Sequence, residues 1–149
     1  MKWAGPIVVL FAVLVGRLVA QPQPSAGTRF QAVDIFIDSG ETPFAAYQIE
    51  FSVKSGNARV VGIEGGEHPA LKDAPFYDPK AIQQERVIIA AFNTSAADKL
   101  PKGKTRVATI HLEAIGEQAG EFIVQLKTAA TAEGRKISPK ATFEERKAQ

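Results

Sequence analysis

The clearest pattern in the chain is a strict alternation of large apolar with mostly polar residues over residues 44–53. Successive side chains of a β-strand point to opposite faces, so this alternation predicts a strand with one buried face and one outward face. A helix would scatter the same large residues around its circumference. The predicted inward side chains are Tyr47, Ile49, Phe51 and Val53, and the predicted outward ones are Ala46, Gln48, Glu50 and Ser52.

Similar segments recur along the chain, separated by stretches rich in glycine, proline and asparagine that are typical of turns. A continuous apolar run at residues 87–92 predicts a strand buried on both faces. Prolines between Glu67 and Gln84 exclude a long helix and a central strand there, so a surface excursion with a short helical turn near its end is predicted. The predicted strands cover residues 33–38, 44–53, 60–63, 87–92, 108–114, 122–126 and, as an edge strand because of Pro139, 136–143; residues 129–132 either extend the sixth strand or begin a partner.

About seven strands with turn signals between them, and no convincing amphipathic helix, predict an all-β fold, an antiparallel β-sandwich. The sandwich is expected at residues 31–143, after a flexible lead-in at 21–30 that is rich in proline and small polar residues. The polar residues 144–149 have nothing to bury and are expected to fray.

The first 20 residues have the pattern of a secretory signal peptide. Lys2 is followed by an apolar run from Ile7 to Val15 and by a small residue, Ala20, at the predicted cleavage point. An uncleaved membrane anchor fits less well, because a span needs roughly 20 apolar residues and Arg17 interrupts the run. The protein is therefore expected to be secreted or periplasmic, with membrane contact only during export.

Removal of that segment leaves 129 of the 149 residues, a length that fits one domain. Two of the 18 basic residues lie in the removed segment, so 16 basic residues remain against 16 acidic ones. A neutral chain without a basic stripe argues against nucleic acid as a partner. The absence of cysteine excludes disulfide scaffolds, thiol catalysis and cysteine-based zinc sites, and it argues against an antibody-type immunoglobulin domain.

Six segments share a characteristic order of strand patterns and glycine turns: VDIFIDSG at 33–40, AAYQIEFSV at 45–53, ARVVGIEGG at 58–66, RVIIAAF at 86–92, GKTRVATIHLEA at 103–114 and EFIVQLKTAATAEGRKI at 121–137. In this order they resemble a cohesin-type domain, within the wider group of sandwich modules that includes some cellulose-binding domains. The resemblance implies a nine-stranded jelly-roll sandwich. It also implies a non-catalytic function, the capture of a small helical partner, a dockerin, through one sheet face.

The chemistry of the side chains offers one candidate reactive cluster. His68 stands beside Glu67, and a loop that folds back could bring both to Asp78 as a metal or acid–base site. The favoured interpretation is that these groups shape a tight loop and satisfy backbone donors. His111 alternates with predicted core residues and should point outward, beside Thr109 and Glu113.

Other polar groups carry weaker signals. Asp34, Asp38 and Glu41 could meet at a strand end and hold calcium, although solvated acids explain them better and their spacing matches no known calcium loop. Residues 93–95, Asn-Thr-Ser, form a glycosylation sequon. No carboxylate, histidine or hydroxyl lies in a recognisable catalytic setting, so neither an enzyme nor a metal or cofactor site is predicted.

The supply of exposed aromatic rings bears on the ligand. Trp3 falls in the signal peptide and Tyr47 in the predicted core, which leaves Tyr77, Phe76 and either Phe44 or Phe36 as exposed rings. So few rings cannot form a platform for a crystalline polysaccharide, so an extracellular protein is the predicted partner, with Tyr77 as the best anchor. The alternative is a carbohydrate-binding module that takes a soluble glycan. The candidate contact residues are Glu67, His68, Tyr77, Asp78, Thr109, His111 and Glu113.

Overall fold

The structure is a computed structural model that describes residues 27–116 and 120–146. The predicted signal peptide, most of the lead-in and the last three residues lie outside these ranges. Within them, no helix is long and apolar enough to cross a membrane.

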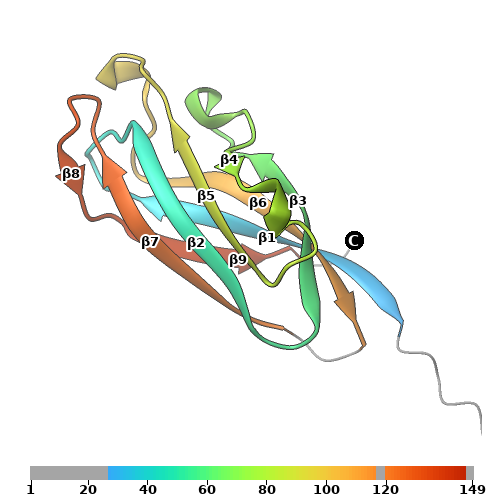
Figure 1. Cartoon of the computed structure of the whole chain (residues 1–149). Helices are drawn as coiled ribbons and strands as arrows, with labels where there is room; N and C mark the ends of the chain where they lie inside the picture. The colour runs from blue at the N-terminus through green and yellow to red at the C-terminus, as the bar shows by residue number, and fades with distance from the viewer. Residues whose placement is uncertain (1–26, 117–119, 147–149) are drawn as a thin grey trace, which may run out of the picture.

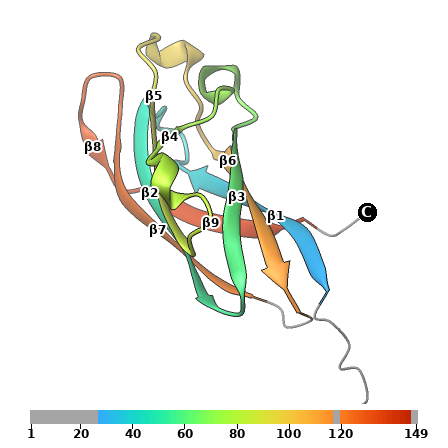
Figure 2. The same cartoon turned by 45° about the vertical axis from the view of Figure 1, so that its right-hand side comes forward.

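The described chain folds into two antiparallel β-sheets that pack face to face (Figures 1 and 2). We call the four-stranded sheet, in the order β3-β6-β1-β9, sheet A, and the five-stranded sheet, in the order β4-β5-β2-β7-β8, sheet B. The predicted all-β antiparallel sandwich is thus confirmed. The strands are β1 (Thr28–Asp38), β2 (Ala46–Ser55), β3 (Ala58–Gly65), β4 (Phe76–Tyr77), β5 (Arg86–Phe92), β6 (Lys104–Ile115), β7 (Glu121–Ala130), β8 (Lys136–Ile137) and β9 (Lys140–Glu145). Three short 3-10 turns complete the described elements: η1 (Pro69–Leu71), η2 (Pro79–Ala81) and η3 (Ala97–Lys99).

The core lies between the two sheets and follows the alternation in the sequence. In β2, Tyr47, Ile49 and Phe51 are buried, and Phe51 lies against Phe122 of β7 with ring centroids 5.5 Å apart. Burial of these apolar side chains is the main favourable contribution to folding. Tyr47 is the polar exception: its hydroxyl donates to the carbonyl of Val107 at 3.1 Å, and burial raises the pKa of that hydroxyl.

A β-bulge in β6 adds one residue to the strand, and the strand keeps its core-facing and outward sides before and after it. In β6, Ile35 pairs with Ala108 and Phe36 pairs with Arg106, which leaves Val107 as the extra residue. Both Val107 and Ala108 are fully buried, so the strand keeps the same faces on either side of the bulge. Residues 106, 109, 111 and 113 therefore share the outer face of sheet A.

Several sequence-based boundaries are corrected. β1 begins at Thr28 and β9 continues to Glu145, so the sandwich extends beyond 31–143, and residues 144–146 do not fray. The segment from Glu67 to Gln84 contains η1, a short strand β4 that pairs with β5, and η2. Pro139 lies where the chain passes from β8, an edge of sheet B, to β9, an edge of sheet A.

The run at residues 87–92 also differs from the prediction. β5 lies between β4 and β2, with Val87 and Ile89 buried against the core. Its other face is not covered: Phe92 is 66% exposed. The continuous apolar pattern thus marks one core face and one apolar outer face.

Candidate binding face

Three of the predicted site residues stabilise the loop that carries them. His68 accepts a hydrogen bond from the amide of Ala70 at 3.1 Å through Nδ1 and so caps η1. Asp78 caps η2 through the amide of Lys80 at 2.9 Å. Glu67 accepts from the amide of Arg106 at 2.9 Å. The three side chains face separate backbone donors, which matches the favoured interpretation of a shaped loop.

The three predicted contact residues of β6 have different surroundings. Glu113 lies between Phe30 of β1 and Arg59 of β3 and is partly exposed. Thr109 lies on the outer face of sheet A but is fully buried, because Asp34, Arg106 and Arg146 cover it. The side chain of Thr109 is therefore not open to a partner, which corrects its place among the candidate contact residues. His111 is partly exposed, with Nε2 3.1 Å from a carboxylate oxygen of Glu64.

A hydrogen-bonded network covers the outer face of sheet A around Thr109. Thr109 donates to Asp34 at 2.6 Å, and Arg146 makes two bonds to the same carboxylate at 2.8 and 2.9 Å. Burial raises the pKa of Asp34, but the bonds from Arg146 and Thr109 outweigh it, so the pKa lies below its ordinary value. The network joins the residue that follows β9 to β1 and β6.

The acidic residues considered for calcium do not come together. Asp34 belongs to the network with Arg146, Asp38 accepts from the amide of Gly40 at 3.1 Å, and Glu41 pairs with Lys102 at 2.8 Å. Across residues 27–116 and 120–146, no group of three or more His, Asp or Glu is arranged to hold a metal ion.

The aromatic candidates separate into inward and outward rings. Phe44 is fully buried, which corrects its assignment as an exposed candidate. Tyr77 pairs with Ile89 on the inward side of β4 and packs against the core, so it is not a free anchor. Phe36 lies partly covered beneath Lys104, whose Nζ is 4.6 Å from the ring centroid. Phe76, in contrast, is 70% exposed.

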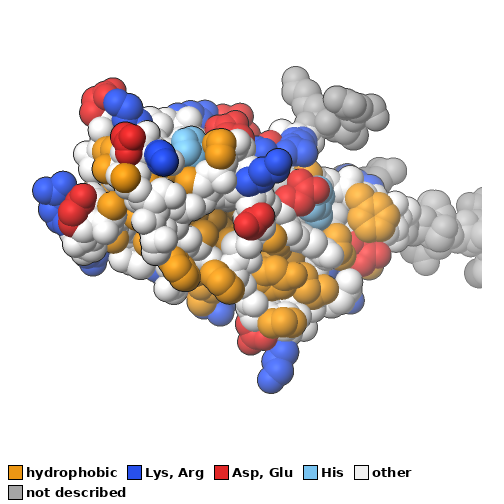
Figure 3. Space-filling view, turned by 90° about the horizontal axis from the view of Figure 1, so that it is seen from above, with side chains coloured by type: hydrophobic (Ala, Val, Ile, Leu, Met, Phe, Trp, Pro, Cys, Tyr) orange, Lys and Arg blue, Asp and Glu red, His pale blue; other side chains and the backbone are white. Residues whose placement is uncertain are grey.

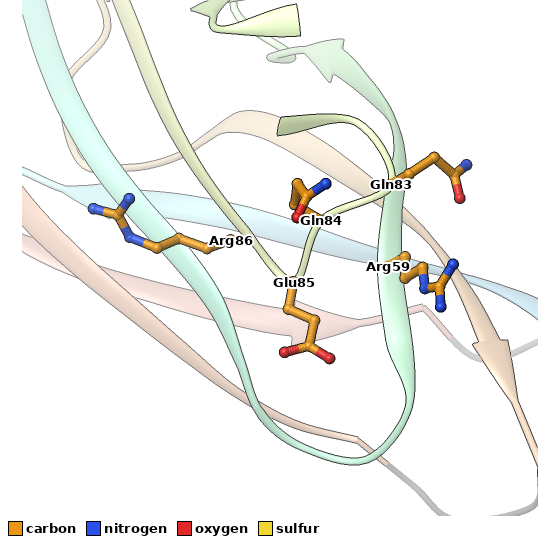
Figure 4. Close-up of a pocket in the computed structure, with 5 residues that line it drawn as sticks. All are labelled: Arg59, Gln83, Gln84, Glu85 and Arg86. Carbon is orange, nitrogen blue, oxygen red and sulfur yellow. The ribbon is translucent and has the colours of Figure 1, made fainter. Parts of the chain in front are cut away.

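One polar pocket lies between the edges of β3 and β5 and is drawn in Figure 4. Its lining side chains do not converge: Arg59 and Gln83 point to one side, and Arg86 points to the other (Figure 4). Arg86 is already paired with Glu50 at 2.8 Å. A ligand site needs polar groups that aim at a common point, so we do not assign one here.

The outer face of sheet B carries the strongest surface feature. Cross-strand pairing arranges its outward residues in two rows, and each row begins with an exposed phenylalanine. The first row is Phe76, Ala90, Gln48 and Thr128, and the second is Phe92, Ala46, Ala130 and Lys136. Alanines give this face a low apolar floor that forms a hollow of about 210 Å³.

The two phenylalanines form a ridge along one side of that hollow. Their rings are stacked, with centroids 6.1 Å apart and planes within 10° of each other. On the other side of the ridge lies a second hollow of about 260 Å³, between β5 and the segment from Ala70 to Pro75. Seen from above, hydrophobic side chains gather along one side of the molecule, with charged groups around them (Figure 3). We call the two rows and the ridge the Phe76–Phe92 face.

The loop that leads to Phe76 is held tightly in place. A Cβ on Gly65 would lie 2.0 Å from the carbonyl of Lys72, and one on Gly66 would lie 2.5 Å from the carbonyl of Arg106. Only glycine allows these close approaches. The amide of Glu67 also donates to the carbonyl of Arg106 at 3.0 Å. The ridge is therefore built on a loop whose path is constrained by close backbone contacts.

Charged residues border the Phe76–Phe92 face on the same sheet. Glu50 lies between Arg86 at 2.8 Å and Lys127 at 3.3 Å. The hydrogen bond from Arg86 is the main cause that lowers the pKa of Glu50. The charged groups of this border are thus paired with one another, whereas the two phenylalanine rings of the Phe76–Phe92 face are exposed to solvent.

Sequence reasoning named Phe76 among its exposed rings but placed Phe92 in a fully buried strand. The signal for Phe92 was present in its position at the end of the run, directly before Asn93, where a strand leaves the sheet. The parity of Phe92 with Ile88 and Ala90, opposite to the buried Val87 and Ile89, also places it on the outer face.

Comparison with known proteins adds no relative: the chain matches no protein-family model, no curated protein and no solved structure.

Proposed function

We propose that the protein is a secreted, non-catalytic binding module of the cohesin-like type, which captures another extracellular protein through the Phe76–Phe92 face. The observation that carries this proposal is a pair of stacked rings, 70% and 66% exposed, beside an alanine floor. Exposed apolar surface of this kind is costly in water and is typical of interaction sites. Stacked aromatic rings around an apolar hollow are frequent anchors at protein interfaces.

The fold and the N-terminal sequence support this proposal. Successive strands pass repeatedly between sheets A and B, as a jelly-roll sandwich of the cohesin type requires. The apolar segment before Ala20 supports export by a signal peptide. The resemblance to cohesins favours a small helical, dockerin-like partner that lies across one sheet face.

The chemistry of the hollow favours a protein over a glycan. Sugars need hydrogen-bonding groups around their hydroxyls, but the floor is made of Ala46, Ala90 and Ala130. Gln48 and Thr128 are the polar side chains that line the same hollow. Apolar side chains from a helix would bury these alanines, which offer no partner to a sugar hydroxyl. A carbohydrate-binding module is the alternative.

A capture experiment with matched variants tests the proposal. The protein, expressed in its host with its native N-terminus, is immobilised and exposed to the host culture medium, and in parallel to a glycan array. Phe76→Ser and Phe92→Ser remove the ridge, and Phe30→Ser is the matched control because Phe30 is 72% exposed on the outer face of sheet A. The captured protein is then purified and titrated calorimetrically against all four forms.

We expect one protein to bind the parent and Phe30→Ser, and to bind either ridge variant at least about tenfold more weakly, which corresponds to about 1.4 kcal/mol. Its binding should show a negative heat-capacity change from apolar burial. Equal binding to all four forms would exclude the Phe76–Phe92 face. Glycan signals lost on the ridge variants, without a captured protein, would replace the proposal with the carbohydrate alternative.

A further inference from the structure

The residue directly after Phe92 connects β5 to the loop that carries Phe76. The side-chain nitrogen of Asn93, Nδ2, donates to the carbonyl of Ala70 at 2.9 Å. Its side-chain oxygen, Oδ1, accepts from the amide of Ser95 at 2.8 Å, and its backbone amide donates to the carbonyl of Ala45 at 2.8 Å. Asn93 therefore ties η1 to the end of β5.

The position of this tie matters for the ridge. Asn93 is part of the wall of the second hollow, together with Ala70 on one side and the two ridge residues on the other. The segment from Ala70 to Pro75 leads directly into Phe76. The bond from Asn93 to Ala70 therefore holds this segment at the end of β5, and it adds to the pairing of Phe76 with Ala90 in placing Phe76 beside Phe92.

We infer that Asn93 is a positioning residue for the Phe76–Phe92 face, and that its amide is occupied by this role rather than available for glycosylation. The inference rests on the proposed function only in assigning the ridge to partner binding. An attached glycan would replace one of the two hydrogens of Nδ2, the atom that donates to Ala70, and would crowd the wall of the hollow beside the ridge.

The two ends of the Asn93 side chain need an amide. A carboxylate keeps the acceptor for Ser95 but places a negative oxygen against the carbonyl of Ala70, where a donor is required. A protonated carboxyl group can again donate to that carbonyl. Asn93→Asp should thus lose the tie at neutral pH and regain it in acid.

The test measures the ridge directly, by NMR of the full chain with isotope-labelled phenylalanine. In the parent, ring protons of Phe76 and Phe92 should show mutual nuclear Overhauser effects between pH 7 and pH 4. In Asn93→Asp these effects should weaken at pH 7 and recover as the pH falls, while the amide signals of β1 and β6 stay in place. Asp73 lines the same hollow and His68 caps η1, so the pH series of the parent corrects for their titration.

A second variant and a control keep the test decisive. Asn93→Ser keeps an oxygen for Ser95 but is too short to reach Ala70, so it should loosen the ridge at every pH. Thr94→Ala changes the exposed neighbour and should behave as the parent. Ring contacts that stay as strong in Asn93→Asp and Asn93→Ser at pH 7 as in the parent would overturn the inference. So would a loss in Asn93→Asp that acid does not reverse.

These readouts need no partner, so they separate the two claims. A ridge that loosens and recovers supports the role of Asn93 even if the capture experiment yields no protein. A glycan on Asn93 in the protein recovered from its host, detected by mass spectrometry, would overturn the second half of the inference.

Discussion

The outer faces of sheets A and B differ in how far their side chains are paired within the chain. On sheet A, Asp34, Thr109 and Arg146 saturate one another with hydrogen bonds across three strands. On sheet B, Phe76 and Phe92 stack on each other and stay exposed to water. The polar groups around Thr109 have completed their contacts within the chain, and Phe30 is a single exposed ring on that face, whereas the other face leaves a stacked pair of rings open.

This difference separates stability from function. A polar network that is partly buried costs free energy when any member is removed, because its partners lose their hydrogen bonds in a site that water does not fully reach. An exposed ring contributes little to folding, since most of its surface is in contact with water in both states. Substitutions in the network of Asp34, Thr109 and Arg146 should therefore change stability, whereas those on the Phe76–Phe92 face should change binding.

The largest change in the free energy of unfolding is expected from the core between the two sheets. Phe51→Ala should lower the free energy of unfolding by about 3–5 kcal/mol, because it removes a fully buried ring that packs on Phe122. Denaturant melts of the folded chain measure this. Ser52→Ala, on the outward side of the same strand, should stay within about 0.5 kcal/mol of the parent. If the two ranked in the reverse order, the face assignment of β2 would be wrong.

Removal of the central carboxylate should give the largest effect on either outer face. Asp34→Ala is expected to destabilise the protein by about 1–3 kcal/mol, since Arg146 and the buried Thr109 lose a partner. The free energy of unfolding is again the measurement. Asp38→Ala, at the exposed end of the same strand, should cost less. Equal losses would mean that the network contributes nothing beyond a surface ion pair.

The same carboxylate should make stability depend on pH. Because the pKa of Asp34 lies below its ordinary value of 3.8 in the folded state, its stabilising contribution is present above that value and is lost as the pH falls through the lower folded pKa. Urea melts of the parent and of Asp34→Asn should thus differ most at neutral pH, and the difference should shrink as the pH falls below 3.8. Glu41 and Glu50 titrate in both proteins, so their contributions to the pH dependence of stability cancel in the comparison. A difference that grows in acid would contradict the assignment.

The smallest stability effect should come from the ridge. Phe92→Ser is expected to change the free energy of unfolding by no more than about 0.5 kcal/mol, because the ring is 66% exposed. A thermal melt beside that of Phe30→Ser checks this. A drop as large as that of Asp34→Ala would place the ring in the core and remove the contrast between the faces.

The sequence by itself determined which side chains of each long strand point inward. Tyr47, Ile49 and Phe51 are buried as their alternation predicts, because the period of two along a strand is a local property of the backbone. The same reasoning gave the all-β class and the turns at glycine, whereas the single edge strand predicted over 136–143 is two strands in different sheets. It also favoured His68 and Asp78 as residues that shape a loop, since capping depends on near neighbours.

The tertiary structure alone decided which outer face is saturated and which is open. Asp34 and Arg146 are 112 positions apart, and no local pattern relates them. Their contact requires β9 to pair with β1, which follows from long-range packing. Sequence reasoning has no access to that packing, so it predicted a free polar tail at residues 144–146 and an exposed contact at Thr109.

The same limit explains Phe92. An apolar run shows that both faces of β5 are apolar, but it does not show whether anything covers the second face. That depends on where sheet B ends and on where the loop after η1 lies, and both are set by contacts between residues distant in the chain. The alternation of side chains follows from the local backbone of each strand, whereas exposure depends on how the two sheets and their loops pack.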